Sequence, residues 1–139
     1  MTVAAYLQPV QIRPGIYIDK ARGKGRGVFT KRKIAKGTTV EESPVIVMEE
    51  SARRHIDQTI LLNYIFEWQP KGKNLSCMAM GYVPVYNHAY KSNCEYEMDY
   101  ETDIITIRAV RDIEAGEELT INYNGDWNNE TEIWFEVKK

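Results

Sequence analysis

The chain has 139 residues, which leaves room for one domain, because domains typically run about 100–150 residues. Apolar residues make up 43 % and charged residues 27 %, and 18 basic against 20 acidic side chains give a net charge of −2, which excludes global disorder. A helical membrane span is also excluded, because no apolar run approaches the roughly 20 residues that it needs. A disulfide scaffold is excluded because Cys77 and Cys94 are the only cysteines.

The first third of the sequence is predicted to form short strands joined by glycine turns. Val, Ile and Thr favour strands, and glycine suits turn positions with a positive φ. The predicted strands cover Ile16–Asp19, Val28–Thr30 and Thr38–Met48, separated by turns at Lys20–Gly27 and Lys33–Gly37.

One segment shows helical spacing. Between His55 and Trp68 the apolar residues recur in steps of three and four, at Ile56, Ile60, Leu61, Tyr64, Ile65 and Trp68. This spacing predicts an amphipathic helix over 55–68, which Pro70-Lys-Gly72 would end.

The second half returns to short extended segments, over Tyr82–Tyr86, Cys94–Asp99, Ile104–Val110 and Glu118–Tyr123. We therefore expect a mostly β fold with one main helix. Segments 32–40 and 111–119 also share an Ile, a Gly three residues later and an aliphatic residue three beyond that, which predicts two similar hairpin entries.

The glycine cluster Gly23-Lys-Gly-Arg-Gly27 does not fit the common nucleotide-binding motifs. A Rossmann fingerprint needs Gly-x-Gly-x-x-Gly at the start of a helix, and a P-loop needs Gly-Lys followed by Ser or Thr. The cluster is either an ordinary hairpin turn or a place where the backbone approaches a ligand, with Lys24 and Arg26 available for an anionic group.

Metal binding and cysteine catalysis are not expected. Cys77, Cys94, His55 and His88 show none of the short spacings of structural zinc sites, so no metal ligand is predicted. A nucleophilic Cys94 with His88 as its base would lack a third group to orient that base.

Asn87-His88 and the acidic run after Cys94 each have two interpretations. The Asn-His pair is either a capped bend or a pair that binds a ligand or a neighbouring strand. Glu95, Glu97 and Asp99 alternate with other residues and would share one face of a strand. They form either a charged edge that prevents aggregation or an acidic lip for a peptide rich in Lys or Arg.

The charges are distributed unevenly. Residues 1–36 carry nine basic side chains and one acidic one, whereas residues 95–139 carry thirteen acidic and four basic ones. Either two solvated faces differ by chance, or a basic patch serves an anionic ligand and an acidic surface serves a cationic partner. Direct nucleic-acid binding is not expected, because no motif for it is visible and the whole chain is acidic.

Few cysteines indicate a reduced compartment, and residues 1–14 lack the charged-then-apolar pattern of a signal peptide. We therefore expect an intracellular protein, cytoplasmic or, in a eukaryotic host, nuclear.

Taken together, the motifs resemble a SET domain. The matching segments are Lys24-Gly-Arg-Gly-Val-Phe29, Ile34-Ala-Lys-Gly37, Val40-Glu-Glu42, Asn87-His88, Asn93-Cys94 and Gly116-Glu-Glu-Leu-Thr-Ile-Asn-Tyr123. Tyr64-Ile-Phe66 and Met78-Ala-Met-Gly81 resemble compact, free-standing members such as the viral histone lysine methyltransferases. The resemblance covers about residues 14–127 and implies a single SET domain over 1–139, with a β-clip fold of short sheets and a knot-like C-terminal threading, an exception to the usual unknotted topology.

The resemblance also implies an activity, namely methyl transfer from S-adenosylmethionine to lysine side chains of a basic protein such as a histone. By that analogy Tyr123 and Tyr64 are the catalytic residues, and Lys24, Gly25, Arg26, Gly27, Tyr64, Asn87, His88 and Trp127 bind the cofactor. Glu95, Glu97 and Tyr86 would bind the substrate.

Two residues depart from the family pattern: Asn122 stands where Asp is frequent, and Ala89 where Ser is common. The zinc-binding cysteines that follow many SET domains are absent after Tyr123. Either the tail 124–139 closes the site or a second subunit does, and the compact members favour a homodimer. The alternatives are an inactive SET-fold module that binds a basic peptide, and an interaction protein in which the motifs are coincidental.

Overall fold

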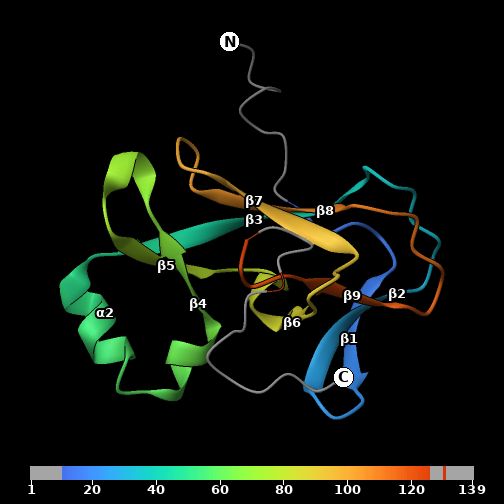
Figure 1. Ribbon diagram of the computed structural model, residues 1–139, viewed down its shortest axis with the longest axis horizontal. Helices are drawn as coiled ribbons and strands as arrows, with labels where there is room; N and C mark the ends of the chain where they lie inside the picture. Colours follow the sequence, from blue (N-terminus) through green and yellow to red (C-terminus); the bar gives the residue numbers. More distant parts are fainter. Residues whose placement is uncertain (1–10, 126–129, 131–139) are drawn as a thin grey trace.

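Residues 11–125 and residue 130 are described by the computed structural model, and every structural statement below concerns them. The strands are β1 (Ile16–Ala21), β2 (Gly25–Thr30), β3 (Thr39–Met48), β4 (Ile65–Trp68), β5 (Leu75–Ala79), β6 (Asn87–His88), β7 (Cys94–Asp99), β8 (Ile104–Ala109) and β9 (Glu118–Ile121). The helical segments are α2 (Glu50–Ile56) and the 3₁₀ turns η1 (Ile60–Tyr64), η2 (Pro70–Gly72) and η3 (Val83–Val85). Figure 1 shows α2 at one end and β1 at the other, with β3, β7 and β8 between them. The expectation of a mostly β fold is confirmed.

The larger sheet has the order β4-β5-β3-β8-β7, with antiparallel neighbours. In β8 burial alternates with period two, and Ile105 and Ile107 are fully buried. The two edge strands approach each other through aromatic rings: the centroids of Phe66 in β4 and Tyr96 in β7 are 5.4 Å apart. The rings of Trp68 and Tyr100 lie 4.8 Å apart in the same way. The sheet is therefore curled, with its two edges facing each other.

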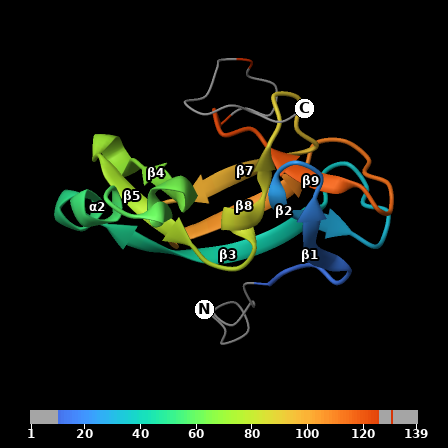
Figure 2. The ribbon, with the colours of Figure 1, turned by 90° about the horizontal axis from the view of Figure 1, so that it is seen from below.

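The smaller sheet has the order β1-β2-β9-β6. Strand β9 pairs with β2 in antiparallel fashion and with β6 in parallel fashion, His88 lying opposite Ile121. In Figure 2, β9 lies against β2 although most of the chain separates them in sequence. The last strand is thus inserted between two earlier segments, and this insertion brings residues 24–27, 87–88 and 123 to one end of the sheet.

The prediction of one helix over 55–68 is wrong. The helix α2 ends at Ile56, and Thr59 redirects the backbone: its hydroxyl donates to the Ile56 carbonyl at 2.8 Å and accepts from the Leu61 N–H at 3.1 Å. The β-branched and aromatic residues that follow then pair with β5 as strand β4. Ile60 is 72 % exposed, so the apolar spacing does not mark a buried helix face.

Three smaller differences concern strands and turns. Residues 82–86 do not form a strand, because Pro84 lies inside the 3₁₀ turn η3. Strand β5 was not anticipated as a separate element. The predicted turn at 20–27 is shorter, since β1 and β2 extend into it and leave only residues 22–24 between them. The strands predicted near residues 94–99 and 104–110 are confirmed.

The two similar segments, 32–40 and 111–119, meet at their isoleucines. Ile34 and Ile113 are both buried and exchange N–H···O=C hydrogen bonds of 2.8 Å in each direction. The repeated pattern therefore corresponds to one paired structural contact. No helix among the described residues is long and apolar enough to cross a membrane.

Candidate active site

Tyr123 lies just after β9 and joins several elements. Its hydroxyl donates to the Tyr86 carbonyl at 2.7 Å, and its backbone N–H donates to Nδ1 of His88 at 2.9 Å. Burial raises the pKa of Tyr123 to about 12, and the nearby Glu118 and Tyr64 add to this rise. Tyr123 is therefore a neutral phenol at neutral pH, and towards any further partner its oxygen is an acceptor.

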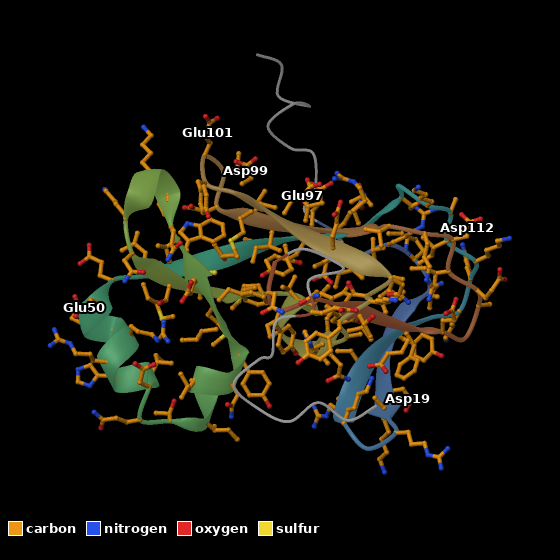
Figure 3. The ribbon with its side chains drawn as sticks, in the orientation of Figure 1. Asp19, Glu50, Glu97, Asp99, Glu101 and Asp112 are labelled. Carbon is orange, nitrogen blue, oxygen red and sulfur yellow. The ribbon has the colours of Figure 1, made fainter. Side chains whose placement is uncertain are left out.

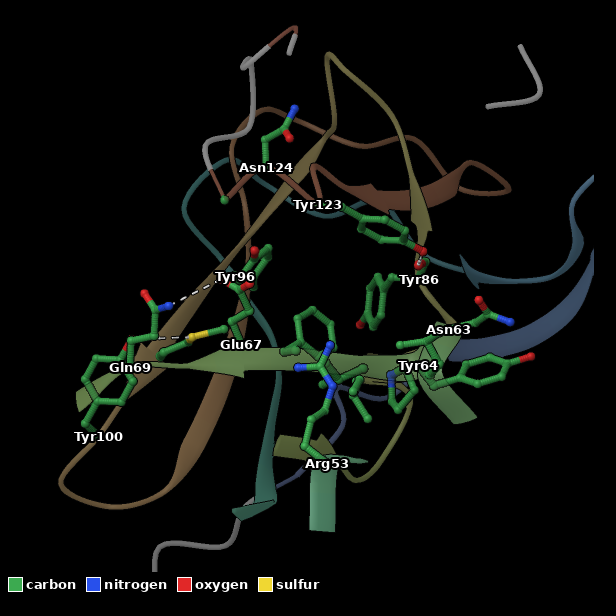
Figure 4. Close-up of a pocket in the computed structure, with 17 residues that line it drawn as sticks. Arg53, Asn63, Tyr64, Glu67, Gln69, Tyr86, Tyr96, Tyr100, Tyr123 and Asn124 are labelled. Atoms are coloured by element: carbon green, nitrogen blue, oxygen red, sulfur yellow. Dashed lines mark hydrogen bonds between the residues drawn. The ribbon is translucent and has the colours of Figure 1, made fainter. Parts of the chain in front are cut away.

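A cavity of about 980 Å³ lies beside Tyr123, at the upper end of the size range of small-molecule pockets. Its lining is rich in aromatic side chains: Tyr64, Phe66, Tyr86, Tyr96, Tyr100 and Tyr123. In Figure 4 the side chains of Tyr86, Tyr96 and Tyr123 lie around the cavity, Tyr64 and Tyr100 lie at its two ends, and Arg53 enters from the side of α2. The cavity is the space left between the facing edges of the curled sheet.

A set of hydrogen bonds and an ion pair connects the turn between β1 and β2 with β6 and β9. Asn87 Nδ2 donates to the Arg26 carbonyl at 2.8 Å and to Glu118 Oε2 at 2.7 Å, and Lys24 Nζ lies 3.3 Å from Glu118 Oε1. We call Lys24, Arg26, Gly27, Asn87 and Glu118 the glycine-turn network. A Cβ atom on Gly27 would overlap the Glu118 carboxylate, so the network requires glycine there for close approach.

His88 connects this network to Tyr123. Since Nδ1 accepts the Tyr123 N–H, the neutral ring carries its proton on Nε2. This Nε2 is buried and has no hydrogen-bond partner among the described residues. Burial lowers the pKa of His88, and the positive charge of Lys24 lowers it further. His88 is thus a neutral imidazole with an unused donor.

The structure brings most of the predicted cofactor residues together. Lys24, Gly27 and Asn87 belong to the glycine-turn network. His88 follows Asn87 directly, and the positive charge of Lys24 lowers its pKa. Arg26 takes part through its carbonyl. Gly25 precedes these residues with a φ of 79° and open space where a Cβ would stand. Their cofactor roles stay predictions.

Tyr64 and Trp127 stand apart from that group. Tyr64 lines the cavity, is 42 % exposed, and lies near enough to Tyr123 to raise its pKa. Its catalytic and cofactor roles also stay predictions. Trp127, like the tail 124–139 beyond Gly125 apart from Glu130, lies outside the described residues.

The three predicted substrate residues are not grouped around the cavity. Strand β7 turns Tyr96 and Met98 towards the cavity, which places Glu95 and Glu97 on its opposite face. Glu97 forms an ion pair with Arg108 of β8, and Figure 3 shows Glu97 on the outer side of the molecule. Tyr86 does line the cavity, but its hydroxyl donates to Glu41. A substrate role for these residues stays a prediction.

Two buried polar residues near the site were not predicted as site residues, although Glu41 lies in a matching segment and Asn122 departs from the family pattern. Glu41 accepts the Tyr86 hydroxyl, although it lies in a strand of Val, Thr and Glu with nothing to mark it as buried. Asn122 donates to the Tyr90 carbonyl at 3.0 Å and accepts from the Asn124 N–H at 2.9 Å. An Asp at this position has no N–H with which to donate, which gives a physical reason for the departure from the family pattern.

The described residues contain neither a reactive cysteine nor a group of metal ligands. Burial raises the pKa of both Cys77 and Cys94 to about 12, so their thiols are protonated and unreactive. Among the described residues, no group of three or more His, Cys, Asp or Glu side chains is placed to hold a metal ion.

The chain is similar in sequence to a known domain family and to two proteins named as histone-lysine methyltransferases. The sequence pattern of the SET domain matches residues 25–124. The Schizosaccharomyces pombe protein named Histone-lysine N-methyltransferase, H3 lysine-37 specific, is 32 % identical over 126 residues, which cover 90 % of this chain and 80 % of that protein. The Mus musculus Histone-lysine N-methyltransferase, H3 lysine-36 specific, is 30 % identical over 119 residues, which cover 80 % of this chain and 5 % of that protein.

Among solved structures, a Plasmodium falciparum protein assigned as a histone methyltransferase matches with a TM-score of 0.60 at 27 % identity, covering 84 % of this chain and 98 % of that one. The chain thus corresponds to most of the yeast and Plasmodium proteins and to a small part of the mouse protein.

Proposed function

Because the chain belongs to the SET-domain family of protein-lysine methyltransferases, we propose that it transfers a methyl group from S-adenosylmethionine to a lysine of a histone or another basic protein. The observation that carries the proposal is the position of Tyr123. Its side chain lines the aromatic cavity, and its backbone binds His88 beside the glycine-turn network. One residue thereby links a space suited to a lysine side chain with a surface suited to a cofactor.

The residues around the glycine turn fit S-adenosylmethionine. The turn at Gly25 is open, so a ligand can approach the backbone there. Lys24 carries a positive charge that is paired with Glu118 and that a ligand carboxylate would share. The unused Nε2–H of His88 marks a buried donor, and buried donors normally have an acceptor. Lys24, Gly25, Arg26, Gly27, Asn87 and His88 are the residues that would hold the cofactor. When bound, S-adenosylmethionine supplies a methyl group that is already activated on a sulfonium.

The cavity suits the second reactant. A lysine amine has a reference pKa of about 10.4 and is protonated at neutral pH, yet only the neutral amine is a nucleophile. Aromatic walls such as Phe66 and Tyr96 disfavour the charged form by desolvation. The Tyr123 oxygen, whose proton is used on the Tyr86 carbonyl, accepts a hydrogen bond from the amine and orients it for in-line attack.

The negative outer face of β7 supports a basic partner. Asp99 is exposed there beside Glu97, whose charge is partly offset by its ion pair with Arg108, and Figure 3 shows Glu101 beyond them in the following turn. Charges of one sign near a site raise the rate at which an oppositely charged partner arrives. These carboxylates steer a basic substrate, while the cavity residues select the lysine.

Incubation of the full chain with core histones and S-adenosylmethionine labelled in its methyl group tests the proposal. The wild-type protein should incorporate label into histones, and Tyr123→Phe should lose most of this activity. Tyr17→Phe is the matched control, since Tyr17 stacks on Phe29 outside the cavity lining, and it should remain active.

Calorimetric titration with S-adenosylmethionine distinguishes a methyltransferase from an inactive module that binds a basic peptide. Binding of S-adenosylmethionine together with labelled histone supports the proposed function. Peptide binding without S-adenosylmethionine binding would contradict it and identify a module that only binds basic peptides.

A further inference from the structure

Glu41 in β3 carries a carboxylate that is fully buried inside the protein. Its exposed fraction is 0 %, and no ion pair joins it to a basic side chain of the described residues. A buried carboxylate is costly unless hydrogen bonds compensate for the lost water. Its position therefore needs a reason other than charge pairing.

The carboxylate is surrounded by donors that come mainly from one short segment. Oε2 accepts the Tyr82 N–H at 2.8 Å and the Ser43 hydroxyl at 2.6 Å, and Oε1 accepts the Tyr86 hydroxyl at 3.0 Å. Burial raises the pKa of Glu41, and these hydrogen bonds, with one from the Val83 backbone, oppose the rise. Glu41 thus holds the segment 82–86 at both of its ends.

Two local features of the backbone make this arrangement possible. The register of β3 against β8 shifts between Thr39 and Glu41, so a β-bulge at Val40 lets consecutive side chains, Val40 and Glu41, both face inward. Gly81 has a φ of 64°, and a Cβ there would overlap the Glu41 carboxylate and the Ser43 hydroxyl. The chain departs from regular structure on both sides of the carboxylate.

The segment that Glu41 holds is the one that positions the site. The Tyr86 carbonyl accepts the Tyr123 hydroxyl, and Figure 4 shows the Tyr123 ring directed at Tyr86. Asn87 and His88 follow immediately as β6. A displacement of Tyr86 would therefore move the acceptor of the Tyr123 proton.

We propose that Glu41 is a positioning residue for methyl transfer: by holding Tyr82 and Tyr86 it fixes the carbonyl that orients the Tyr123 hydroxyl. This inference rests on the proposed function for its catalytic consequence, and on the geometry alone for the orientation of Tyr123. Glu41 itself does not line the cavity and touches no reacting atom.

Hydroxyl exchange of Tyr123 tests the orientation without any ligand. Protein labelled with ¹³C at the tyrosine Cζ atoms reports the exchange rate of each phenol proton by NMR. We expect the Tyr123 hydroxyl to exchange about tenfold faster in Glu41→Gln and in Tyr86→Phe than in the wild type, because its acceptor is no longer held. Glu42→Gln, at the next position of β3, is the matched control and should leave the rate unchanged. An unchanged rate in folded Tyr86→Phe and Glu41→Gln overturns the proposal.

A double-mutant cycle tests the consequence for catalysis. Glu41→Gln should lower kcat by about 10-fold to 100-fold with little change in KM. A displaced Tyr123 hydroxyl would no longer hold the amine in line with the methyl group, which raises the barrier to transfer. In a Tyr123→Phe background the same substitution should lower kcat no further, since residues that act as a unit are not additive. An equal loss in both backgrounds overturns the proposal. If the wild type transfers no methyl group, the proposed function fails and the exchange rates alone decide on Glu41.

Discussion

Tyr123 and His88 are joined by a hydrogen bond that leaves the Nε2–H of His88 without a partner among the described residues. The Tyr123 proton is used on the Tyr86 carbonyl and leaves the oxygen as an acceptor, while His88 uses Nδ1 on the Tyr123 N–H and retains the Nε2 donor. Tyr123 lines the cavity, and the positive charge of Lys24 acts on the His88 ring. In the proposed function, these two neighbouring residues serve two different ligands, Tyr123 the lysine and His88 the cofactor.

Lys24→Ala should raise the pKa of His88 towards its ordinary value of 6.5. Burial is the largest cause of the lowered pKa, and the positive charge of Lys24 is the next. The titration of the His88 ring by NMR measures the change. Lys20→Ala is the control, since Lys20 lies on the same hairpin and is exposed. An unchanged His88 titration in Lys24→Ala would contradict the electrostatic link.

The same lowered pKa predicts a pH dependence of stability. As the pH falls below 6.5, the unfolded chain takes up a proton at His88 before the folded chain does, so the free energy of unfolding decreases. Urea unfolding between pH 7.5 and pH 5.5 should show a smaller decrease for Lys24→Ala than for the wild type. An identical decrease would argue against a contribution from Lys24.

Gly27→Ala tests the close approach within the glycine-turn network. Its Cβ would overlap Glu118 and crowd Asn87, and such overpacking costs about 1–3 kcal/mol. We expect weaker binding of S-adenosylmethionine by calorimetry together with a lower unfolding free energy. Gly37→Ala is the control: its φ of 86° costs about 1–2 kcal/mol, but its Cβ meets open space and lies outside the network. Equal losses of cofactor binding in both variants would contradict the role of Gly27.

At the scale of elements, the strands were predictable and the helix was not. Strands such as β7 and β8 follow from alternation and from β-branched residues, which are local properties. The spacing from His55 to Trp68 satisfies a helical period equally well, but pairing of β4 with β5 and the turn at Thr59 decide the outcome. Tertiary pairing overrides local spacing here.

Two substitutions test this corrected assignment. Ile60→Ser in η1 should change the free energy of unfolding by less than about 0.5 kcal/mol, because Ile60 is 72 % exposed. Ile105→Ala in β8 should cost about 2–5 kcal/mol, because Ile105 is fully buried. Urea denaturation measures both. A large loss for Ile60→Ser would indicate a buried helix face after all.

The candidate site was predictable only as far as its motifs reach. Asn87, His88 and Tyr123 follow from the resemblance, and the structure brings them together through the insertion of β9 beside β6. Glu41 lies in a matching segment, but its burial was not predictable, because it depends on a β-bulge and on the backbone of Gly81, and neither produces a periodic pattern in the sequence. The acidic side chains of β7 were identified correctly as one face, but that face is turned away from the cavity.

At the scale of the whole molecule, the curled sheet and the inserted strand create a two-sided site. The facing edges β4 and β7 leave the aromatic cavity, and the smaller sheet places the glycine turn, β6 and β9 beside it. Tyr123 is the residue common to both sides. In the proposed function, a methyl group passes from a cofactor on one side to a lysine on the other.

Mass spectrometry of histones incubated with the protein and S-adenosylmethionine carrying a deuterated methyl group tests this claim most directly. We expect the heavy methyl group on lysine Nζ atoms with the wild type, and its loss with Tyr123→Phe. A heavy methyl group on other residue types, or an equal amount on lysine with Tyr123→Phe, would contradict it.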